Sequence, residues 1–393
     1  MSEDLGGGLK AIGQYDMRFN LDAAYRNQAE ASLITTSAQG TPAANVTRGS
    51  SYATGSPTVN FAAGGNSHVG LAGNFGSVRL GRQDIYYVDT PSLLPAGLYL
   101  AANSQPVFHA LATANASRTP NLLWWVSPRI NGFEGTVAYS TNPLRASGTN
   151  EGEADVGTRS ATRKGSGMVL RLNYVNGPID ATFVNMDYKS DYTTAGLGSN
   201  CYTQGYFTSG TNATAAAGSQ GACDNGQADQ KGNTLVLKYQ VNNALRVAFG
   251  MSDEKTILTS ATSSSSVFGN ADPYGNGYNP AGNAGQVKSA RATSFSASYD
   301  MGAWNFAMNQ ANRGNYKFDG LEAASTGASI TTLAATYNFS KRTAAGLMWT
   351  TLKNDGNNAT GLFYQANNAY GGQSPAFAGE NHNITSLALR HNF

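Results

Sequence analysis

The feature that most constrains the fold is an alternation of apolar and polar side chains that recurs along the chain. In the closing segment ITSLALRHNF, alternate residues share one face of a strand, because strand side chains point to opposite faces in turn: Thr385, Leu387, Leu389, His391 and Phe393. A soluble sheet can show this pattern in one strand, but the same period returns here in segment after segment. Repeated alternation between turn residues is typical of a barrel that crosses a membrane with its strands. The sequence therefore predicts an all-β fold, a transmembrane antiparallel β-barrel.

About fourteen strands can be recognised, and the links between them fall into two classes. The expected strands are 9–17, two within 66–83, 121–127, 133–140, 168–175, 179–187, 234–241, 244–252, 292–301, 303–310, 331–339, 343–352 and 384–393. The short links are 176–178, 241–243 and 340–342, and the long links, expected to be external loops, are 22–65, 188–232, 253–290 and 353–382. Short turns at one end and long loops at the other are the arrangement of outer-membrane barrels, so we expect a single domain over residues 1–393.

Composition removes several other classes of protein. No uninterrupted apolar run approaches the roughly 18 residues that a membrane helix needs. The formal net charge is only +2, and the Lys and Arg residues are dispersed, so nucleic acid is not an expected partner. The opening MSEDLGGGLK has neither the basic nor the apolar region of a signal peptide, so we expect a mature or trimmed form, or a missing start.

Cys201 and Cys223 are the only cysteines, and they lie in one polar, Gly-rich stretch. In an oxidising compartment an exposed pair of this kind is expected to form a disulfide, with two free thiols as the alternative. No His lies near them and their spacing matches no zinc pattern, so we expect no metal and no cofactor.

The segment 84–118 is about 35 residues long, which is unusual for a connection without secondary structure of its own. Its aromatic residues and prolines argue against disorder. We therefore expect a functional loop here, with an exposed surface loop as the alternative.

Four motifs follow one another in the chain: SEDLGGGLKAI at 2–12, GNFGSVRLGRQ at 73–83, SPRINGFEGTVAYS at 127–140 and LALRHNF at 387–393. Together they resemble the trimeric general porins of Gram-negative bacteria, particularly the β-proteobacterial type. The resemblance implies an outer-membrane location, contact with membrane lipid and lipopolysaccharide, and a homotrimer. It also implies sixteen strands, two of them before the SEDLGGGLK run, so an N-terminal hairpin is expected to be absent from this chain. A truncated sequence is the simpler explanation, and a barrel closed with fourteen strands is the alternative.

The same resemblance implies two further features. The third external loop, 84–118, would fold into the barrel and narrow the pore. The outward residues of the final strand would form a C-terminal assembly signal: Leu387, Leu389, His391 and Phe393.

Alternation also predicts which charged side chains face the lumen, because the apolar face of each strand must contact lipid. The expected lumen-facing basic residues are Lys10, Arg79, Arg171, Lys238, Arg246 and Arg390. Asp16, Glu134 and Asp180 are the lumen acids by the same rule. Basic groups predominate, and basic groups along a narrow passage lower the barrier for anions. The alternative for each residue is a position near a rim of the barrel, with its charge directed to water.

The resemblance adds a pore constriction to this picture. In the family, the Arg of the LGRQ motif belongs to a basic cluster that faces acids on the inward loop, and that residue is Arg82 here. Strict alternation turns Arg82 outward, whereas a bulge at the strand end would break the pattern. Arg118, where the loop returns, is the expected second basic residue. Asp84 and Asp89 are the nearest acids of the loop, and the aromatic residues expected to line the constriction are Tyr86, Tyr87 and Phe108.

An enzyme is not expected, because no nucleophile motif accompanies any of the four histidines. The function predicted from the sequence is a water-filled channel for passive diffusion of small anionic or neutral solutes and ions, with modest anion preference. Two alternatives stay open: a substrate-selective porin for organic acids, and a non-conducting barrel that acts as a surface adhesin or anchor.

Overall fold

The computed structural model describes residues 1–17, 63–86, 91–95, 104–111, 119–141, 143, 166–189, 228–258, 287–358 and 379–391. Within these ranges 17 strands form one sheet, accompanied by the four-residue helix α3 (Gln105–Phe108). The strands are β1 (Ser2–Gly6), β2 (Leu9–Met17), β3 (Ala63–Gly73), β4 (Gly76–Gln83), β5 (Thr119–Val126), β6 (Phe133–Ser140), β7 (Ser166–Asn176), β8 (Ile179–Lys189), β9 (Ala228–Gln240), β10 (Leu245–Leu258), β11 (Val287–Met301), β12 (Trp304–Arg313), β13 (Lys317–Phe318), β14 (Leu321–Glu322), β15 (Ala328–Asn338), β16 (Thr343–Asn354) and β17 (His382–His391).

None of the helices in the described ranges has the length and apolar character needed to span a membrane.

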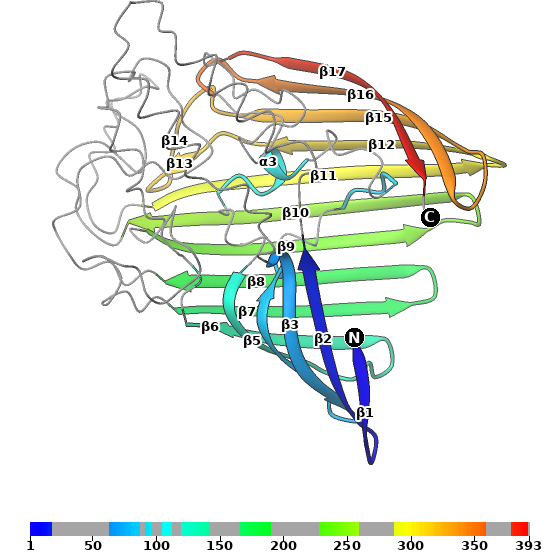
Figure 1. The fold of residues 1–393 in the computed structure, drawn as a ribbon. Helices are drawn as coiled ribbons and strands as arrows, with labels where there is room; N and C mark the ends of the chain where they lie inside the picture. Colours follow the sequence, from blue (N-terminus) through cyan, green and yellow to red (C-terminus); the bar gives the residue numbers. More distant parts are fainter. Residues whose placement is uncertain are drawn as a thin grey trace, which may run out of the picture.

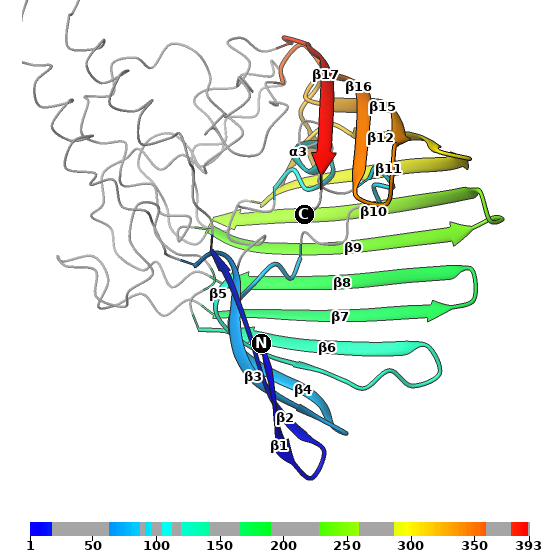
Figure 2. The ribbon, with the colours of Figure 1, turned by 45° about the vertical axis from the view of Figure 1, so that its right-hand side comes forward.

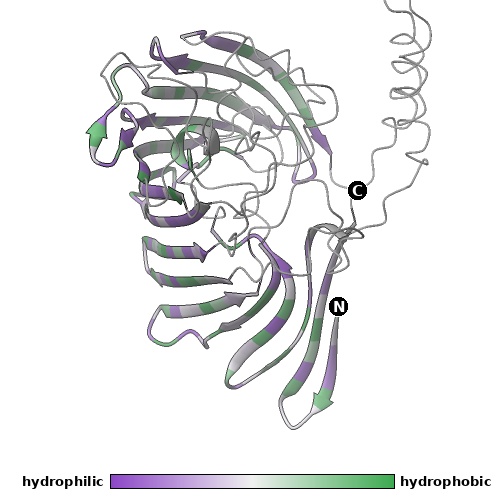
Figure 3. Cartoon of the chain, turned by 90° about the vertical axis from the view of Figure 1, so that its left-hand side faces the viewer, coloured by the Kyte–Doolittle hydropathy of each residue, from purple (hydrophilic) through white to green (hydrophobic). Residues whose placement is uncertain are grey.

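Strands that follow one another in the sequence also lie side by side in the sheet. Antiparallel pairings run consecutively from β1 to β12 and continue through β15, β16 and β17. The short strands β13 and β14 form a hairpin beside the end of β12 and extend the sheet on β11. The strands build a curved wall (Figures 1 and 2), which is open between β17 and the β1–β2 hairpin (Figure 3).

Some of the short turns at one end of the wall depend on glycine. Gly177 (φ 54°) joins β7 to β8, and Gly302 (φ 60°) joins β11 to β12. Both residues adopt the left-handed backbone conformation, which glycine enters at no steric cost because it has no Cβ. Tight turns at these positions let the long strands pair along nearly their whole length.

The two faces of the wall differ as the alternation predicted. Hydrophobic and hydrophilic residues alternate along the strands (Figure 3). Large apolar side chains exposed on the convex face include Leu170, Leu172, Leu235, Leu237, Phe249, Met251, Phe306 and Leu333. At the short-turn end of this face the rings of Trp304 and Tyr337 lie 4.9 Å apart, and Phe339 lies 4.9 Å from Tyr337. Aromatic residues at this level are typical of a membrane–water interface, so the convex face is the one that suits lipid.

The long strands, β2 to β12 and β15 to β17, match the fourteen predicted strands in number and order. Many of them extend further toward the loop end than predicted. The flanks of the expected loops 188–232 and 253–290 are strand, because β9 begins at Ala228, β10 continues to Leu258 and β11 begins at Val287. The expected loops 22–65 and 353–382 overlap strands by smaller margins.

These extensions escaped the sequence pattern because their inward positions are polar. Glu254, Thr256 and Lys288 are buried on the concave side. Asp253 and Lys255, which alternate with them and face outward, are polar too. These strand ends, which extend beyond the membrane, therefore show no alternation of apolar and polar residues. The prediction also missed β1, whose residues Asp4 and Glu3 pair with Lys10 and Ala11 of β2.

Candidate functional site

The concave side of the wall is occupied by parts of the segment 84–118, which confirms the inward-folded third loop. Helix α3 lies inside the curve of the sheet (Figure 3). Val107 and Phe108 of this helix are fully buried in a cluster with apolar residues of the inner wall: Ala292, Ala311, Ala328, Ile330 and Leu352. Further along the wall, Leu94 packs against Ala334 and Met348. The loop therefore rests on β11, β12, β15 and β16.

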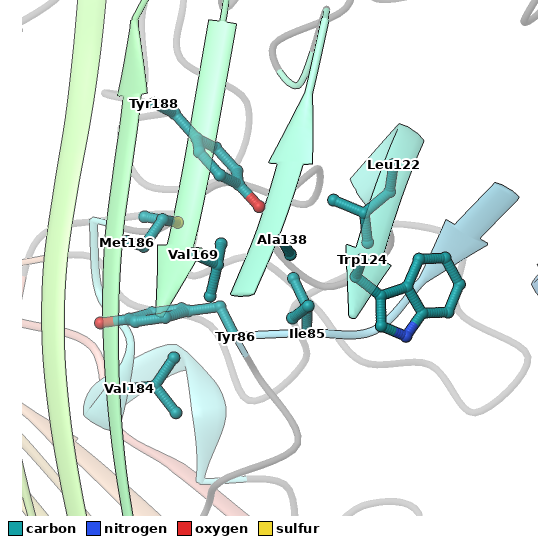
Figure 4. Close-up of a cluster of buried hydrophobic side chains, with 9 residues drawn as sticks. All are labelled: Ile85, Tyr86, Leu122, Trp124, Ala138, Val169, Val184, Met186 and Tyr188. Atoms are coloured by element: carbon teal, nitrogen blue, oxygen red, sulfur yellow. The ribbon is translucent and has the colours of Figure 1, made fainter. Parts of the chain in front are cut away.

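The start of the loop is held by a second cluster on the opposite part of the wall. Ile85 and Tyr86 leave β4 and insert among inward side chains of β5 to β8 (Figure 4). The wall residues in this cluster are Leu122, Trp124, Ala138, Val169, Val184, Met186 and Tyr188. Burial of so many apolar groups gives this end of the loop a fixed position.

Two glycines on the inner wall allow the loop to approach closely. A Cβ at Gly232 would stand 2.3 Å from the hydroxyl oxygen of Tyr86. A Cβ at Gly250 would stand 2.7 Å from Cγ of Pro91 and 2.9 Å from Cζ of Phe108. Neither distance is possible for a real side chain, so the loop position requires glycine at both places.

Hydrogen bonds add direction to this packing. The Leu93 N–H donates to Oγ of Ser296 at 3.1 Å, and Nδ2 of Asn309 donates to Oγ of Ser104 at 3.3 Å. The Ser252 hydroxyl donates to the carbonyl oxygen of Phe108. The contacts come from three strands, β10, β11 and β12, so they fix the loop in more than one direction.

The structure places the predicted basic residues on the concave side. Arg171 lies opposite Thr136 and Val184, both of which are buried on that side. Lys238 lies directly opposite Asp180, and Nη2 of Arg246 is 3.6 Å from Oδ2 of Asp300. Basic residues at concave-side register positions are Lys10, Arg79, Arg171, Lys238, Arg246, Lys288, Arg313 and Arg390, and the acidic ones are Asp4, Glu134, Asp180, Glu254 and Asp300. Among the described strand residues, basic groups outnumber acids on the inner wall.

Arg82 lies at an irregularity of the sheet. The register between β4 and β5 shifts between Gly81 and Gln83, and Gly81 has a φ of 149°. A bulge is therefore present at this strand end. A bulge breaks the strict alternation of side chains between the two faces, so Arg82 need not point outward. Next to it, the Asp84 N–H donates to Oδ1 of Asn66 at 2.7 Å, which ties the start of the loop to β3.

Other predicted residues have different surroundings. Tyr86 and Phe108 are fully buried, so their rings pack inside the wall clusters and do not border an open passage. On β17, Leu387 and Leu389 are 82% and 75% exposed, and Nδ1 of His391 lies 2.9 Å from Oγ1 of Thr343. Several predicted residues fall outside the described residues: Tyr87, Asp89, Arg118, Cys201, Cys223 and Phe393. The side chain of Asp16 also falls outside them.

Three charged residues of the inner wall were missed by the sequence reasoning. Glu254 is 2% exposed, and Lys288 and Arg313 are each 3% exposed. Nζ of Lys288 lies 4.0 Å from the centroid of the Tyr316 ring, and Cζ of Arg313 lies 3.9 Å from it. The available signal was the period of two in Gly250, Ser252 and Glu254, in which small and polar residues continue the inward face. The described residues contain no group of three or more potential metal ligands.

Comparison with known proteins agrees with this architecture. The family described as Gram-negative porin matches residues 1–357 of the chain. The anion-selective porin from Comamonas acidovorans has a similar structure, with a TM-score of 0.58 and 20% identity, over 100% of this chain and 87% of that chain. Outer-membrane expressed OmpT of Vibrio cholerae is also similar, with a TM-score of 0.51 and 12% identity, over 83% of this chain and 80% of that chain. No curated protein matches the chain.

Proposed function

The chain belongs to the Gram-negative porin family, and from this premise we propose that it carries small hydrophilic solutes and ions by passive diffusion, with a modest preference for anions. Its place is the outer membrane of a Gram-negative bacterium, where the family forms channels. The proposal concerns what passes through the channel and which side chains select it.

The observation that carries the proposal is the charge of the inner wall. Basic residues there outnumber acidic ones, and some of the acids lie beside basic partners: Asp180 opposite Lys238, and Asp300 beside Arg246. Arg171 lies six residues before the turn glycine Gly177, and Arg79 lies three residues after Gly76 at the β3–β4 turn. A net positive wall lowers the barrier for anions and raises it for cations. The similar porin from Comamonas acidovorans is described as anion-selective, which favours the same sign.

The test is a reversal potential in a planar bilayer under a KCl gradient. We expect the wild type to be anion-selective and the double variant Arg79→Gln/Arg171→Gln to shift toward cations. A unit charge about 6 Å from an ion in water contributes on the order of 0.7 kcal/mol, or about threefold in relative permeability for each charge. The reversal potential of Arg82→Ala, measured in the same way, tests whether the arginine at the bulge also faces the passage.

Arg291→Gln is the matched control. Arg291 is a highly exposed arginine on the convex side of β11, and its Nε lies 2.6 Å from Oδ2 of Asp253. Its removal lowers the net charge of the chain by one, as each single substitution of the double variant does, without changing the inner wall. An equal shift in the control and the double variant would contradict selection by the inner wall.

Two other functions give different results in this experiment. A substrate-selective porin for organic acids would show chloride current that a dicarboxylate or aromatic acid blocks at low concentration. A folded and inserted barrel with no conductance would instead indicate an adhesin or anchor. We propose no catalytic activity, because the fold and the family point to a channel.

The assembly expected from the sequence, a homotrimer in contact with outer-membrane lipid and lipopolysaccharide, is part of the proposal. Chemical crosslinking in native membranes should give a ladder that ends at three subunits. A ladder that ends at one or two would contradict the homotrimer without affecting the channel.

A further inference from the structure

One buried carboxylate on the inner wall contacts the inward loop at both of its ends. Glu254 projects from β10, and its Oε1 accepts a hydrogen bond from the Tyr86 hydroxyl at 3.1 Å. The same oxygen lies 2.8 Å from Nδ1 of His109, and Oε2 accepts the backbone N–H of Leu111 at 2.7 Å. Glu254 therefore collects three contacts from a loop that is far from it in the sequence.

These contacts come from the two limbs of the loop. Tyr86 belongs to the limb that leaves β4, whereas His109 and Leu111 follow helix α3 on the limb that returns to β5. Glu254 therefore has hydrogen-bond partners on both limbs. The apolar clusters hold each limb against a different part of the wall. Between the limbs, the rings of Tyr86 and His109 lie 5.0 Å apart, and the Glu254 carboxylate ties both of these residues to β10.

The donors are oriented for an ionised carboxylate. Oγ1 of Thr234 donates to the Tyr86 oxygen at 3.0 Å, which leaves the Tyr86 proton for Glu254. Burial raises the pKa of Tyr86 well above its ordinary value, and the nearby Glu254 charge raises it further, so the hydroxyl remains a donor. Ionised acceptors form hydrogen bonds about twice as strong as neutral ones, and a buried acceptor left without donors is costly.

We propose that Glu254 is a positioning residue, which clasps both limbs of the inward loop and thereby sets the width and steadiness of the passage. The inference rests on the proposed channel function. It gives Tyr86, which the sequence placed in the constriction, the role of an anchor behind it. It also assigns a purpose to a glutamate that lies inside the stretch 253–290, which the sequence assigned to an external loop.

Glu254→Gln tests the clasp with almost no change in shape. The amide has one oxygen in place of two, and its NH2 group must face either the Leu111 N–H or the Tyr86 and His109 donors. We expect single-channel conductance to change by about twofold or more, with frequent brief closures or substates. The folded barrel should persist, as checked by circular dichroism and by the heat-dependent mobility shift on a denaturing gel.

Asp253→Asn is the matched control, because the neighbouring carboxylate faces the convex side and pairs with Arg291. It should conduct as the wild type does. Conductance and closure frequency of Glu254→Gln equal to those of the control, in a folded barrel, would overturn the inference.

If Glu254→Gln does not fold, the loop-side variant Tyr86→Phe/His109→Gln tests whether Glu254 positions the loop. It leaves the carboxylate in place and removes two of its partners, so steady wild-type openings in that variant would also overturn the clasp. A wild type that conducts nothing would instead contradict the proposed channel function. The two failures are therefore distinguishable.

Discussion

At the scale of single residues, the distance from a charge to the passage decides its effect. In water at physiological ionic strength a charge is screened beyond about 8 Å, so an arginine on the convex side has little influence on ions in the lumen. Arg79 and Arg171 lie on the concave side, and Arg291 lies on the convex side. Glu254 need not oppose anion passage for a different reason: three groups of the loop contact its carboxylate.

The fit between the loop and the wall at Gly232 provides a residue-scale prediction. Gly232→Ala places a methyl group where the Tyr86 hydroxyl now lies, so Tyr86 must move and its bonds to Glu254 and Thr234 must weaken. We expect a loss of about 1–3 kcal/mol, the usual cost of overpacking. A lower urea midpoint of unfolding in detergent micelles would show it. Gly135→Ala is the control, because its Cβ would meet nothing closer than Oγ of Ser127 at 3.9 Å and should leave the midpoint unchanged.

At the scale of elements, each strand has to satisfy lipid on one side and the lumen on the other. On β12 the convex positions pass from Trp304 through Phe306 and Met308 to Gln310 and Asn312. The apolar band therefore ends within the strand, and the polar part continues above it. This division explains why the strands are longer than the stretch that alternates in hydropathy.

A charge placed within the band should cost more than one placed above it. Phe306→Arg should destabilise folding into phospholipid vesicles by about 2–4 kcal/mol, whereas Asn312→Arg on the same face should cost about 0–1 kcal/mol. Urea titration of folding in vesicles measures both. Equal costs for the two variants would contradict the placement of the band.

The cysteine pair belongs to an element outside the described residues, and its disulfide stays a prediction. A bridge between Cys201 and Cys223 would stiffen the loop predicted to be external. Reduction with dithiothreitol should shift mobility on a gel and leave the conductance nearly unchanged. A large change in conductance on reduction would place that loop in the passage instead.

At the scale of the whole molecule, the inner wall acts as a sum of charges whose reach depends on salt. Basic residues come from strands all around the curve, from β2 to β17. The Debye length falls from about 10 Å at 0.1 M salt to about 3 Å at 1 M, so distant members of the set lose their influence first.

Anion preference should therefore decrease as the KCl concentration rises. Reversal potentials at a fixed concentration ratio, measured from 0.1 M to 1 M KCl, should approach the value of a neutral pore. The double variant Arg79→Gln/Arg171→Gln should show a weaker dependence. Preference that stays constant over this range would indicate selection by a narrow binding site in place of the wall as a whole.

The sequence predicted more of the fold than of the site. Alternation located the long strands and the side of each strand that carries Arg171 or Lys238, because the period of two is a local property of the chain. The residues that hold the inward loop gave no such signal. Glu254 has a polar neighbour on each side, and Gly232 and Gly250 are two of the 46 glycines of the chain, so nothing local distinguishes them.

By itself the sequence determined an all-β chain of long antiparallel strands whose two faces differ, one apolar and the other polar with several basic residues. These follow from alternation and turn chemistry, which act between residues close in the chain. The tertiary structure alone decided that the loop after β4 crosses the concave side, that its two limbs meet at Glu254, and that Tyr86 is an anchor inside the wall. These contacts join residues more than 140 positions apart, and only the curvature of the completed sheet brings them together.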